Sequence, residues 1–281
     1  MSRVLVSASS HRYDNTATGI VTAFPFTLYG YFKFTGSKPT TGFPTFMGPM
    51  LDFDSFAVIR YRGQSSQDTL DARQEDGSGA SSERTMASVA ADTWFAGAAV
   101  FASATSRTIY VNSTAGTTDT TNLALPAVNR FHVGALWNSG SYAGYIDGEV
   151  ADVGLVPAAA TSGEIADFAS GISGQVVWPA GAYGSRNGER AHWDFFGDTG
   201  PNETDVINSI VLTANGTPAQ GTHPTLDYGG GGGSPVGAGR GMAPGLVPGI
   251  GRGMARSAAG LFVPRPKRLW FPGLSLPALP A

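Results

Sequence analysis

The chain has 281 residues, 42% of them hydrophobic and 14% charged, so it is long and apolar enough to bury a sizeable core. It has no cysteine, which excludes disulfides and thiolate metal sites, and no apolar run of about eighteen residues that would span a membrane. The low charge and the 39 glycines, without long helical patterns, favour an all-β protein. The first residues lack the apolar core of a signal peptide, so we expect synthesis in the cytoplasm.

Charge is distributed unevenly along the chain. Residues 1–227 hold 12 basic and 21 acidic side chains, a net charge of −9, whereas residues 228–281 hold 6 basic side chains and no acid. An acidic body with a basic C-terminal segment predicts that this segment binds a partner.

The first half of the chain alternates between strand patterns and polar runs. Residues 1–20 are weakly patterned and fit either an edge strand or a loose arm. Aromatic and apolar residues alternate over 26–34, which predicts a strand with an aromatic inner face. Glycine and proline predict a loop over 36–49, and a second strand is expected over 55–62. The polar run 63–84 has the composition of an exposed hairpin tip or a long loop.

The central part of the chain carries the clearest local signals. Strands are predicted over 93–101 and 107–112, followed by a strand over 131–137 in which every second side chain shares one face. The turn residues 138–141 reverse the chain into a further strand over 142–155.

A short helix is predicted next, over about 161–170. Thr161 and Glu164 have the spacing of a capping box, in which each side chain accepts a hydrogen bond from a free amide of the first turn. Ile165 and Phe168 fall on one apolar stripe, and Gly171 suits the end of the helix.

These elements together resemble concanavalin A-like, laminin-G-like jelly-roll domains. The resemblance rests on the Trp94–Phe101 and Ile109–Asn112 strands and on the pieces Phe131–Ala135, Gly144–Val150 and Glu164–Phe168. Ser113 stands where the family usually has glycine, so the turn there is expected to differ. The resemblance covers roughly residues 20–228, most clearly 90–171, and implies an all-β jelly-roll sandwich. Late strands at about 175–178, 191–196 and 206–213 would pair with early strands to close it.

The domain organisation follows from a composition change after Asp227. Residues 1–228 form the expected sandwich, 229–238 a glycine-rich linker that begins with five consecutive glycines, and 239–281 an extended tail. The motif Gly-Arg-Gly-Met-Ala occurs in the tail at 239–243 and 251–255, and prolines exclude a long helix or a central strand. The tail's aromatic and basic residues are predicted to bind a partner: Arg240, Met242, Arg252, Met254, Arg256, Phe262, Arg265, Lys267, Arg268, Trp270 and Phe271.

Acidic and histidine side chains are the candidates for catalysis or metal binding. Asp147, Glu149 and Asp152 have a spacing that resembles the acid pair of some jelly-roll glycoside hydrolases, yet in laminin-G-like domains this segment is mostly structural, so no catalysis is expected. No cofactor is expected either. The open alternative is a Ca²⁺ ion, bound by these acids or by Asp52 and Asp54. The histidines show no ligand spacing: His11, His132, His192 and His223.

Two histidines and three tyrosines have predicted positions. His132 and His192 lie beside apolar strand residues and are expected to face outward. Tyr142, Tyr145 and Tyr183 could stack on sugar rings from loop tips.

The chain resembles structural proteins of tailed bacteriophages, because it combines a sandwich, a polyglycine segment and a basic tail that contains a repeat. This resemblance implies a non-enzymatic virion protein, either a capsid decoration or a minor capsid-associated protein, made in the host cytoplasm and attached to other virion proteins through its tail. The alternative is a carbohydrate-binding tail-fibre or adhesin module that binds host-surface glycans. The protein could also form a homo-oligomer. Nucleic-acid binding is not expected, because three cations among prolines in the tail give little affinity for nucleic acid. The resemblance does not imply binding to a membrane.

Overall fold

The computed structural model describes residues 2–16, 20–52, 54–64, 67–78, 81–86, 89–138, 140–171, 191–193, 195, 202–204 and 209–224. The chain divides into two units, Met1–Arg240 and Gly241–Ala281, and all described residues belong to the first. Within them, no helix has the length and hydrophobicity needed to cross a membrane.

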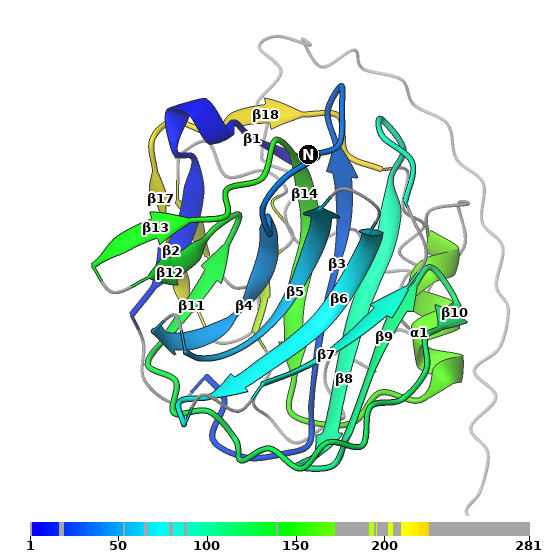
Figure 1. Ribbon diagram of the computed structural model, residues 1–281. Coiled ribbons are helices and arrows are strands. Elements are labelled where there is room, and N and C mark those ends of the chain that lie inside the picture. The colour runs from blue at the N-terminus through cyan, green and yellow to red at the C-terminus, as the bar shows by residue number, and fades with distance from the viewer. Residues whose placement is uncertain are drawn as a thin grey trace, which may run out of the picture. The chain divides into compact units, whose positions relative to one another are not determined.

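The described residues form two antiparallel sheets of eight strands each, which we name sheet A and sheet B (Figure 1). In spatial order, sheet A contains β10 (Thr114–Ala115), β9 (Ser106–Val111), β8 (Phe95–Ser103), β3 (Phe26–Phe34), β14 (Gly148–Val156), β1 (Ser2–Leu5) and β18 (Ala219–Gly221), with β15 (Ala191–Trp193) also paired to β14. Sheet B contains β16 (Glu203–Thr204), β17 (Val211–Asn215), β2 (Arg12–Asn15), β11 (Arg130–Val133), β4 (Thr45–Asp52), β5 (Ser55–Gln64), β6 (Gln67–Asp76) and β7 (Ser81–Met86).

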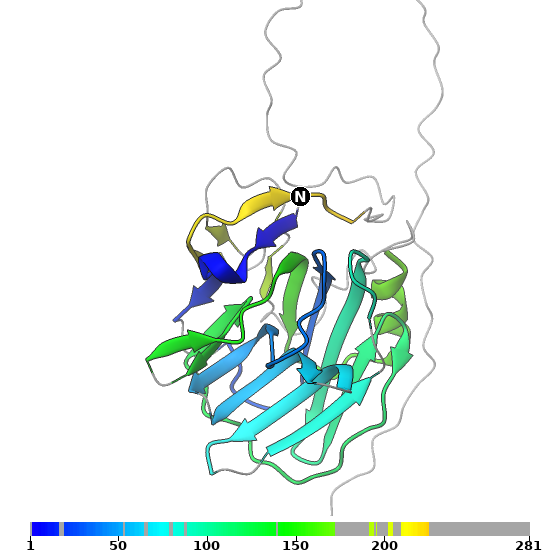
Figure 2. The ribbon, with the colours of Figure 1, turned by 45° about the horizontal axis from the view of Figure 1, so that its top comes forward.

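Three small elements complete the described fold. A 3₁₀ turn, η1 (Ser7–Ser9), joins β1 to β2. A separate hairpin is formed by β12 (Leu136–Asn138) and β13 (Ser141–Ala143), and Figure 2 shows it projecting at the side of the sandwich. One α-helix, α1 (Ser162–Ser170), follows β14 within the described residues. The all-β sandwich with one short helix is therefore confirmed.

An aromatic core lies between the sheets. Strand β3 supplies Phe32 and Phe34, whose rings pack on Phe46 of β4 with centroids 4.5 and 5.2 Å apart. Toward the other end of the sandwich, Phe131 stacks on Trp193 at 5.1 Å. Because large aromatic rings bury much apolar area, this layer is a main source of the fold's stability.

Helix α1 covers the outer face of sheet A. The predicted capping box is present: Thr161 accepts from the amide of Glu164, and the Glu164 carboxylate accepts from the amide of Thr161. Phe168 packs against Tyr29 and Tyr31, and the Tyr31 hydroxyl donates a hydrogen bond to the Phe168 carbonyl. Strand β3 is therefore buried on both faces, because the helix covers the tyrosines that alternate with the inner phenylalanines.

Late strands pair with early ones, as a closed jelly roll requires. Strand β18 pairs with β1, β17 with β2, and β15 with β14. The predicted strand at 175–178 lies outside the described residues.

Four local predictions were wrong. The run 63–84 is not a long loop and is more than a hairpin tip: after the turn between β5 and β6 it contains β6 and β7, because two inward residues of β6, Leu70 and Ala72, suffice to bury one side of a polar strand. Strand β4 begins inside the predicted loop 36–49. Strand β2 lies inside sheet B rather than at an edge or in a loose arm. The predicted strand 142–155 is two strands, because residues 144–147 interrupt it and Gly144 adopts φ 58°.

Candidate functional site

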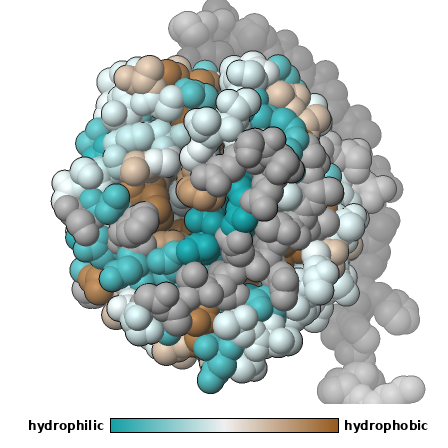
Figure 3. All heavy atoms as spheres, viewed as in Figure 1, coloured by the Kyte–Doolittle hydropathy of each residue, from teal (hydrophilic) through white to brown (hydrophobic). Residues whose placement is uncertain are grey.

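The outer face of sheet B, which points away from the core, is the candidate site. Side chains alternate along strands, so when Tyr13 and Phe131 enter the core, their neighbours Arg12, Asp14 and Arg130 emerge on the outer face. The register pairs His132 of β11 with Asp14 of β2. Figure 3 views the molecule from this side and shows apolar and strongly hydrophilic atoms next to each other near the middle of the face.

The β12–β13 hairpin packs on this face through an apolar contact. Leu136 lies in a buried cluster with Met50, Phe56 and Val58 of β4 and β5, and Trp137 packs against the same cluster. The Trp137 amide also points at the Met50 sulfur, 3.2 Å away. This anchoring fixes the position of the aromatic side chains that the hairpin carries.

The hairpin and strands β2 and β11 together build an aromatic and polar set, which we name the hairpin site: Arg12, Asp14, Arg130, Trp137 and Tyr142. The Arg12 guanidinium carbon lies 3.4 Å from the Tyr142 ring centroid, and the Tyr142 hydroxyl donates to Asp14 Oδ2 at 2.8 Å. Trp137 meets Tyr142 edge to face at 4.7 Å, and Arg130 lies 4.5 Å from the Trp137 ring. Each ring is thereby oriented by a cation and a neighbouring ring.

His132 lies beneath this set: it points away from the core, as expected for an outward-facing strand position, but it is completely buried. The hairpin covers it, and its ring meets Tyr142 edge to face at 5.2 Å. Burial, with Arg130 and Arg12 nearby, lowers the pKa of His132 to about 3. The ring is therefore neutral at physiological pH, and neither ring nitrogen has a hydrogen-bond partner among the residues that the structure describes.

A second set on the same face, farther along the sheet, is rich in arginine. We name it the arginine cluster: Arg60 and Arg62 of β5, and Asp71, Arg73 and Glu75 of β6. Arg60 Nε and Arg62 Nε each lie 3.3 Å from the same oxygen, Asp71 Oδ2. Arg73 pairs with Glu75, whose Oε1 accepts from Arg73 Nε at 2.9 Å.

The sugar-stacking and tail predictions have different outcomes. Tyr142 is in the hairpin site, and Tyr145 is half-buried in the segment between β13 and β14. Tyr183 and all the predicted tail residues lie outside the described residues. Sequence analysis missed Arg12, Arg130 and Trp137 as partners of Tyr142, because the strands that carry them are distant in the chain and meet only in the sheet.

The acidic run on β14 does not form one catalytic pair. Asp147 accepts hydrogen bonds from the Ser7 amide at 2.7 Å and from the Ser7 hydroxyl at 2.5 Å. Glu149 pairs with Lys33 at 2.5 Å and accepts from Ser2 at 2.7 Å. Within the described residues, no group of three or more histidine or acidic side chains is arranged to hold a metal ion.

Asp152 instead forms a buried polar cluster inside sheet A. Its two carboxylate oxygens lie 3.2 Å from His192 Nε2 and 3.0 Å from His223 Nε2. His192 Nδ1 in turn lies 3.0 Å from the Tyr29 hydroxyl. His192 points away from the core, as expected, but it is only 4% exposed. No sequence spacing could have joined these histidines, since His192 reaches Asp152 through the pairing of β15 with β14 and His223 follows β18.

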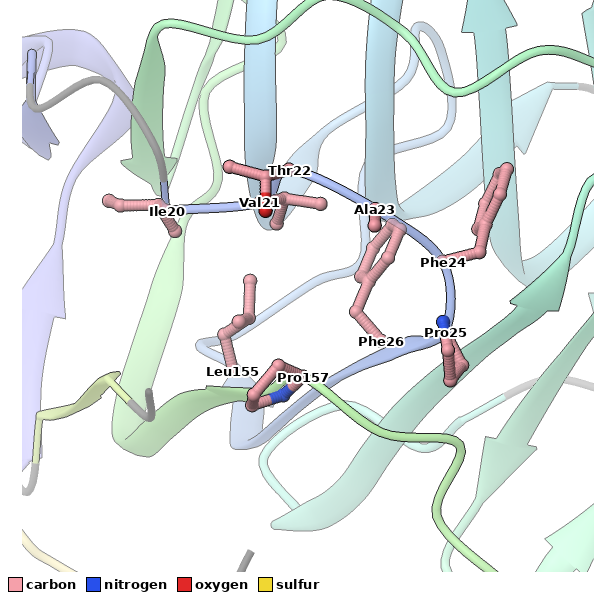
Figure 4. A pocket seen from close by; sticks show the side chains of 9 residues that line it. All are labelled: Ile20, Val21, Thr22, Ala23, Phe24, Pro25, Phe26, Leu155 and Pro157. Atoms are coloured by element: carbon pink, nitrogen blue, oxygen red, sulfur yellow. The ribbon is translucent and has the colours of Figure 1, made fainter. Parts of the chain in front are cut away.

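An apolar hollow of about 240 Å³ lies beside the start of β3. Figure 4 shows Leu155 and Pro157 facing the segment from Ile20 to Phe26 across it. The lining offers the Thr22 hydroxyl as its one side-chain hydrogen-bonding group.

Comparisons with known proteins support the fold. No protein-family model and no curated protein matches the chain. Among solved structures, a protein from Bacteroides ovatus named as a suspected carbohydrate-binding protein matches with a TM-score of 0.55 and 13% identity, over 81% of this chain and 61% of that one. The chain thus spans less than two thirds of that protein, and at this identity the likeness shows a lectin-like jelly-roll fold and nothing about activity.

Two weaker structural matches have TM-scores below 0.5. A pentraxin from Limulus polyphemus matches with a TM-score of 0.41 and 13% identity, over 58% of this chain and 83% of that one. The NanB sialidase from Streptococcus pneumoniae matches with a TM-score of 0.46 and 17% identity, over 59% of this chain and 27% of that one.

Proposed function

We propose that the sandwich is a non-enzymatic carbohydrate-binding module and that the hairpin site contacts the sugar. The observation that carries this proposal is the oriented Trp137–Tyr142 pair, held by Arg12, Arg130 and Asp14 at the surface. Sugars combine an apolar ring face with hydroxyls that donate and accept, and this set offers an aromatic surface beside guanidinium donors and carboxylate acceptors.

The rigidity of the site supports binding. Every member of the hairpin site has a fixed neighbour, so little side-chain freedom remains to be lost when a ligand binds. The fold is shared with a protein named for carbohydrate binding, which supports the proposed function by analogy only. A role in binding rather than hydrolysis accords with the separate partners of Asp147, Glu149 and Asp152.

Removing the Trp137 ring tests this function. In a Trp137→Ala variant we expect affinity for the glycan identified on an array to fall about tenfold or more, because one stacking ring contributes about 1–2 kcal/mol. Trp94→Ala is the matched control, since Trp94 lies near Lys33 of sheet A, with 5.2 Å between the ammonium and the ring. Equal affinity of the two variants, or no glycan bound by the unmodified protein, would refute the proposal.

We also propose, from the sequence, that the tail anchors this module to other proteins of a virion. The support is the contrast between a body of net charge −9 and a tail with six cations and several aromatic residues. Guanidinium groups pair with partner carboxylates, and Met, Phe and Trp side chains fill pockets on partner surfaces. The sandwich would then be displayed on the particle and could reach host-surface glycans.

Deleting residues 229–281 tests the anchoring role. We expect the truncated protein to keep the circular-dichroism spectrum and melting curve of the β-sandwich, yet to be absent from purified particles, because the deletion leaves every described strand intact. Retention of the truncated protein on particles would reject the anchor and leave the carbohydrate-binding proposal unaffected.

A further inference from the structure

The outer face of sheet B has the opposite charge balance to the rest of the body. Residues 1–227 carry a net charge of −9. The hairpin site and the arginine cluster nevertheless place five arginines on this face, against the acids Asp14, Asp71 and Glu75 and the Glu83 position of β7, which lies opposite Arg73 in the register. Basic side chains in a predominantly acidic body have therefore gathered on one surface, where they raise the local concentration of anions.

Two guanidinium groups of the arginine cluster are held side by side. Arg60 and Arg62 share one Asp71 oxygen, each at 3.3 Å, and both approach the ring of Phe43, with guanidinium carbons 4.5 and 5.8 Å from its centroid. The Asp71 carboxylate and the Phe43 ring together hold the two guanidinium groups in place before a ligand binds. Guanidinium donors held in place suit the recognition of a carboxylate or sulfate group.

Arg73 adds a third cation on the neighbouring strand. The register places Arg73 opposite Val58 and Asp71 opposite Arg60, so Arg73 is adjacent to the Arg60 position on the same face. Asp71, Glu75 and the Glu83 position opposite Arg73 are the acids beside these three cations.

The cluster is electrostatically costly to the folded protein. Burial, followed by the charge of Arg73, lowers the pKa of Arg60 to about 10. Burial also raises the pKa of Asp71, and it outweighs the attraction of Arg60 and Arg62. A buried ion pair whose two partners both shift toward their neutral forms contributes little stability, and such groups concentrate at functional sites.

We propose that the arginine cluster binds the anionic group of an acidic saccharide whose neighbouring rings contact the hairpin site. This inference rests on the proposed carbohydrate-binding function and names its ligand class. Strands β2, β11, β4, β5 and β6 are consecutive in sheet B, so the two sets together span about 20 Å at the usual strand spacing. That span requires an oligosaccharide. The anionic group is a carboxylate or a sulfate, since both present oxygens that match two guanidinium forks.

A glycan suits this surface better than a nucleic acid. A nucleic acid has a phosphate on every nucleotide and would bring many charges against a body of net charge −9. An acidic glycan can place one charge at the cluster and an uncharged ring at Trp137.

Calorimetric titration of the full-length protein tests the inference with four probes: an oligogalacturonate, a heparin oligosaccharide, maltohexaose and a single-stranded oligonucleotide. We expect at least one acidic glycan to bind more tightly than maltohexaose, and binding to weaken in about 1 M salt, where charges are screened beyond about 3 Å. The oligogalacturonate carries only carboxylates and heparin also carries sulfates, so their ranking identifies the anionic group.

Single substitutions locate the site. Arg62→Gln and Arg73→Gln are expected to weaken the acidic glycan about tenfold or more, because each removes charged hydrogen bonds. Arg73→Lys should recover part of the loss. Lys33→Gln, which removes one paired cation from sheet A, is the matched control and should have no effect. Melting curves check folding, and Arg73, whose side chain is 20% exposed, is the safer of the two sites.

Each outcome decides the question. Unchanged acidic-glycan affinity in folded Arg73→Gln would overturn the inference. Equal binding of maltohexaose and acidic glycans would overturn it while the carbohydrate-binding function stands. No binding of any glycan would overturn both, and tighter binding of the oligonucleotide would assign the cluster to nucleic acid instead.

Discussion

Asp152→Asn is expected to lower the free energy of unfolding by about 3–5 kcal/mol, the usual effect of breaking one side of a buried ionic network. Asp152 is fully buried, and its two oxygens face His192 and His223 at 3.2 and 3.0 Å. An asparagine replaces one acceptor oxygen with an NH₂ donor, which cannot accept a hydrogen bond from a histidine N–H. One histidine would then lose its acceptor inside the protein.

The backbone at Asp152 makes asparagine a clean test of this charge. Strand β14 has a register shift between Ala151 and Gly154 against β3, and Asp152 adopts φ 44° within this irregularity. Asparagine and aspartate tolerate this left-handed conformation better than other side chains with a Cβ atom. The substitution therefore changes the hydrogen bonding without adding backbone strain, whereas Asp152→Ala would change both.

The effect has a defined pH dependence. Burial alone would raise the pKa of Asp152, but hydrogen bonds from His192 and His223 outweigh it and hold the pKa below the usual 3.8. A carboxyl group with a lowered folded-state pKa stabilises the protein above its unfolded-state pKa, and this contribution disappears as the pH falls through the folded-state value. The part of the stability difference that comes from the Asp152 carboxylate should thus be fully present above about pH 4 and narrow below that.

Urea unfolding at a series of pH values measures this difference. Asp167→Asn on the exposed face of α1 makes the same chemical change and should alter stability by less than about 0.5 kcal/mol. A loss below about 1 kcal/mol for Asp152→Asn, or a difference that stays constant down to about pH 2, would show that the carboxylate contributes little.

The sequence predicted elements whose signals are local. Strand β3 shows alternating aromatic residues over nine positions, and α1 begins at a capping box that involves only Thr161 and Glu164. Strand β6 escaped prediction because its outer face carries Asp71, Arg73 and Glu75, so its composition is that of a loop. Only the position of β6 between β5 and β7 shows that such polar residues belong to a paired strand.

The candidate site was predictable only in part. Tyr142 follows a turn signal and was identified, but its contacts with Arg12 and Asp14 come from the antiparallel pairing that places β2 beside β11. The burial of His132 was not predicted for the same reason, since an alternating strand does not show that a hairpin will cover its outer face. Sheet order and hairpin packing are tertiary properties that periodicity does not encode.

Arg107→Met is the second substitution with a large expected effect, again about 3–5 kcal/mol of unfolding free energy. Arg107 of β9 is fully buried, and its guanidinium donates to Asp119 Oδ2 at 2.9 Å and to the carbonyls of Thr121 and Ala104 at 2.9 and 2.7 Å. Its Nε also donates to Gln74 of β6 at 3.2 Å, so one side chain links both sheets to the segment that follows β10.

The Asp119 carboxylate shows the strength of this network. Burial would raise the pKa of Asp119, but hydrogen bonds from the Thr121 amide, from Arg107 and from the Thr121 hydroxyl together hold the pKa below its usual value. Losing Arg107 would leave a 3% exposed carboxylate without its cation. It would also remove one donor from the Thr121 carbonyl and from the Gln74 side-chain oxygen, whereas the Ala104 carbonyl keeps the Leu123 amide, and each unsatisfied buried group costs about 1–3 kcal/mol.

A double-mutant cycle separates the ion pair from the other bonds. Arg107→Met, Asp119→Leu and the double variant are compared by urea unfolding, and the double variant is expected to lose at least about 1 kcal/mol less than the sum of the single losses, because no buried charge then stays unpaired. Strict additivity would mean that Arg107 acts only through the carbonyls and Gln74.

Because Arg107 belongs neither to the hairpin site nor to the arginine cluster, the glycan affinity of the folded Arg107→Met protein should be unchanged. A stability loss without an affinity loss would show that this arginine maintains the sandwich, whereas Arg62 and Arg73 are placed to serve the ligand.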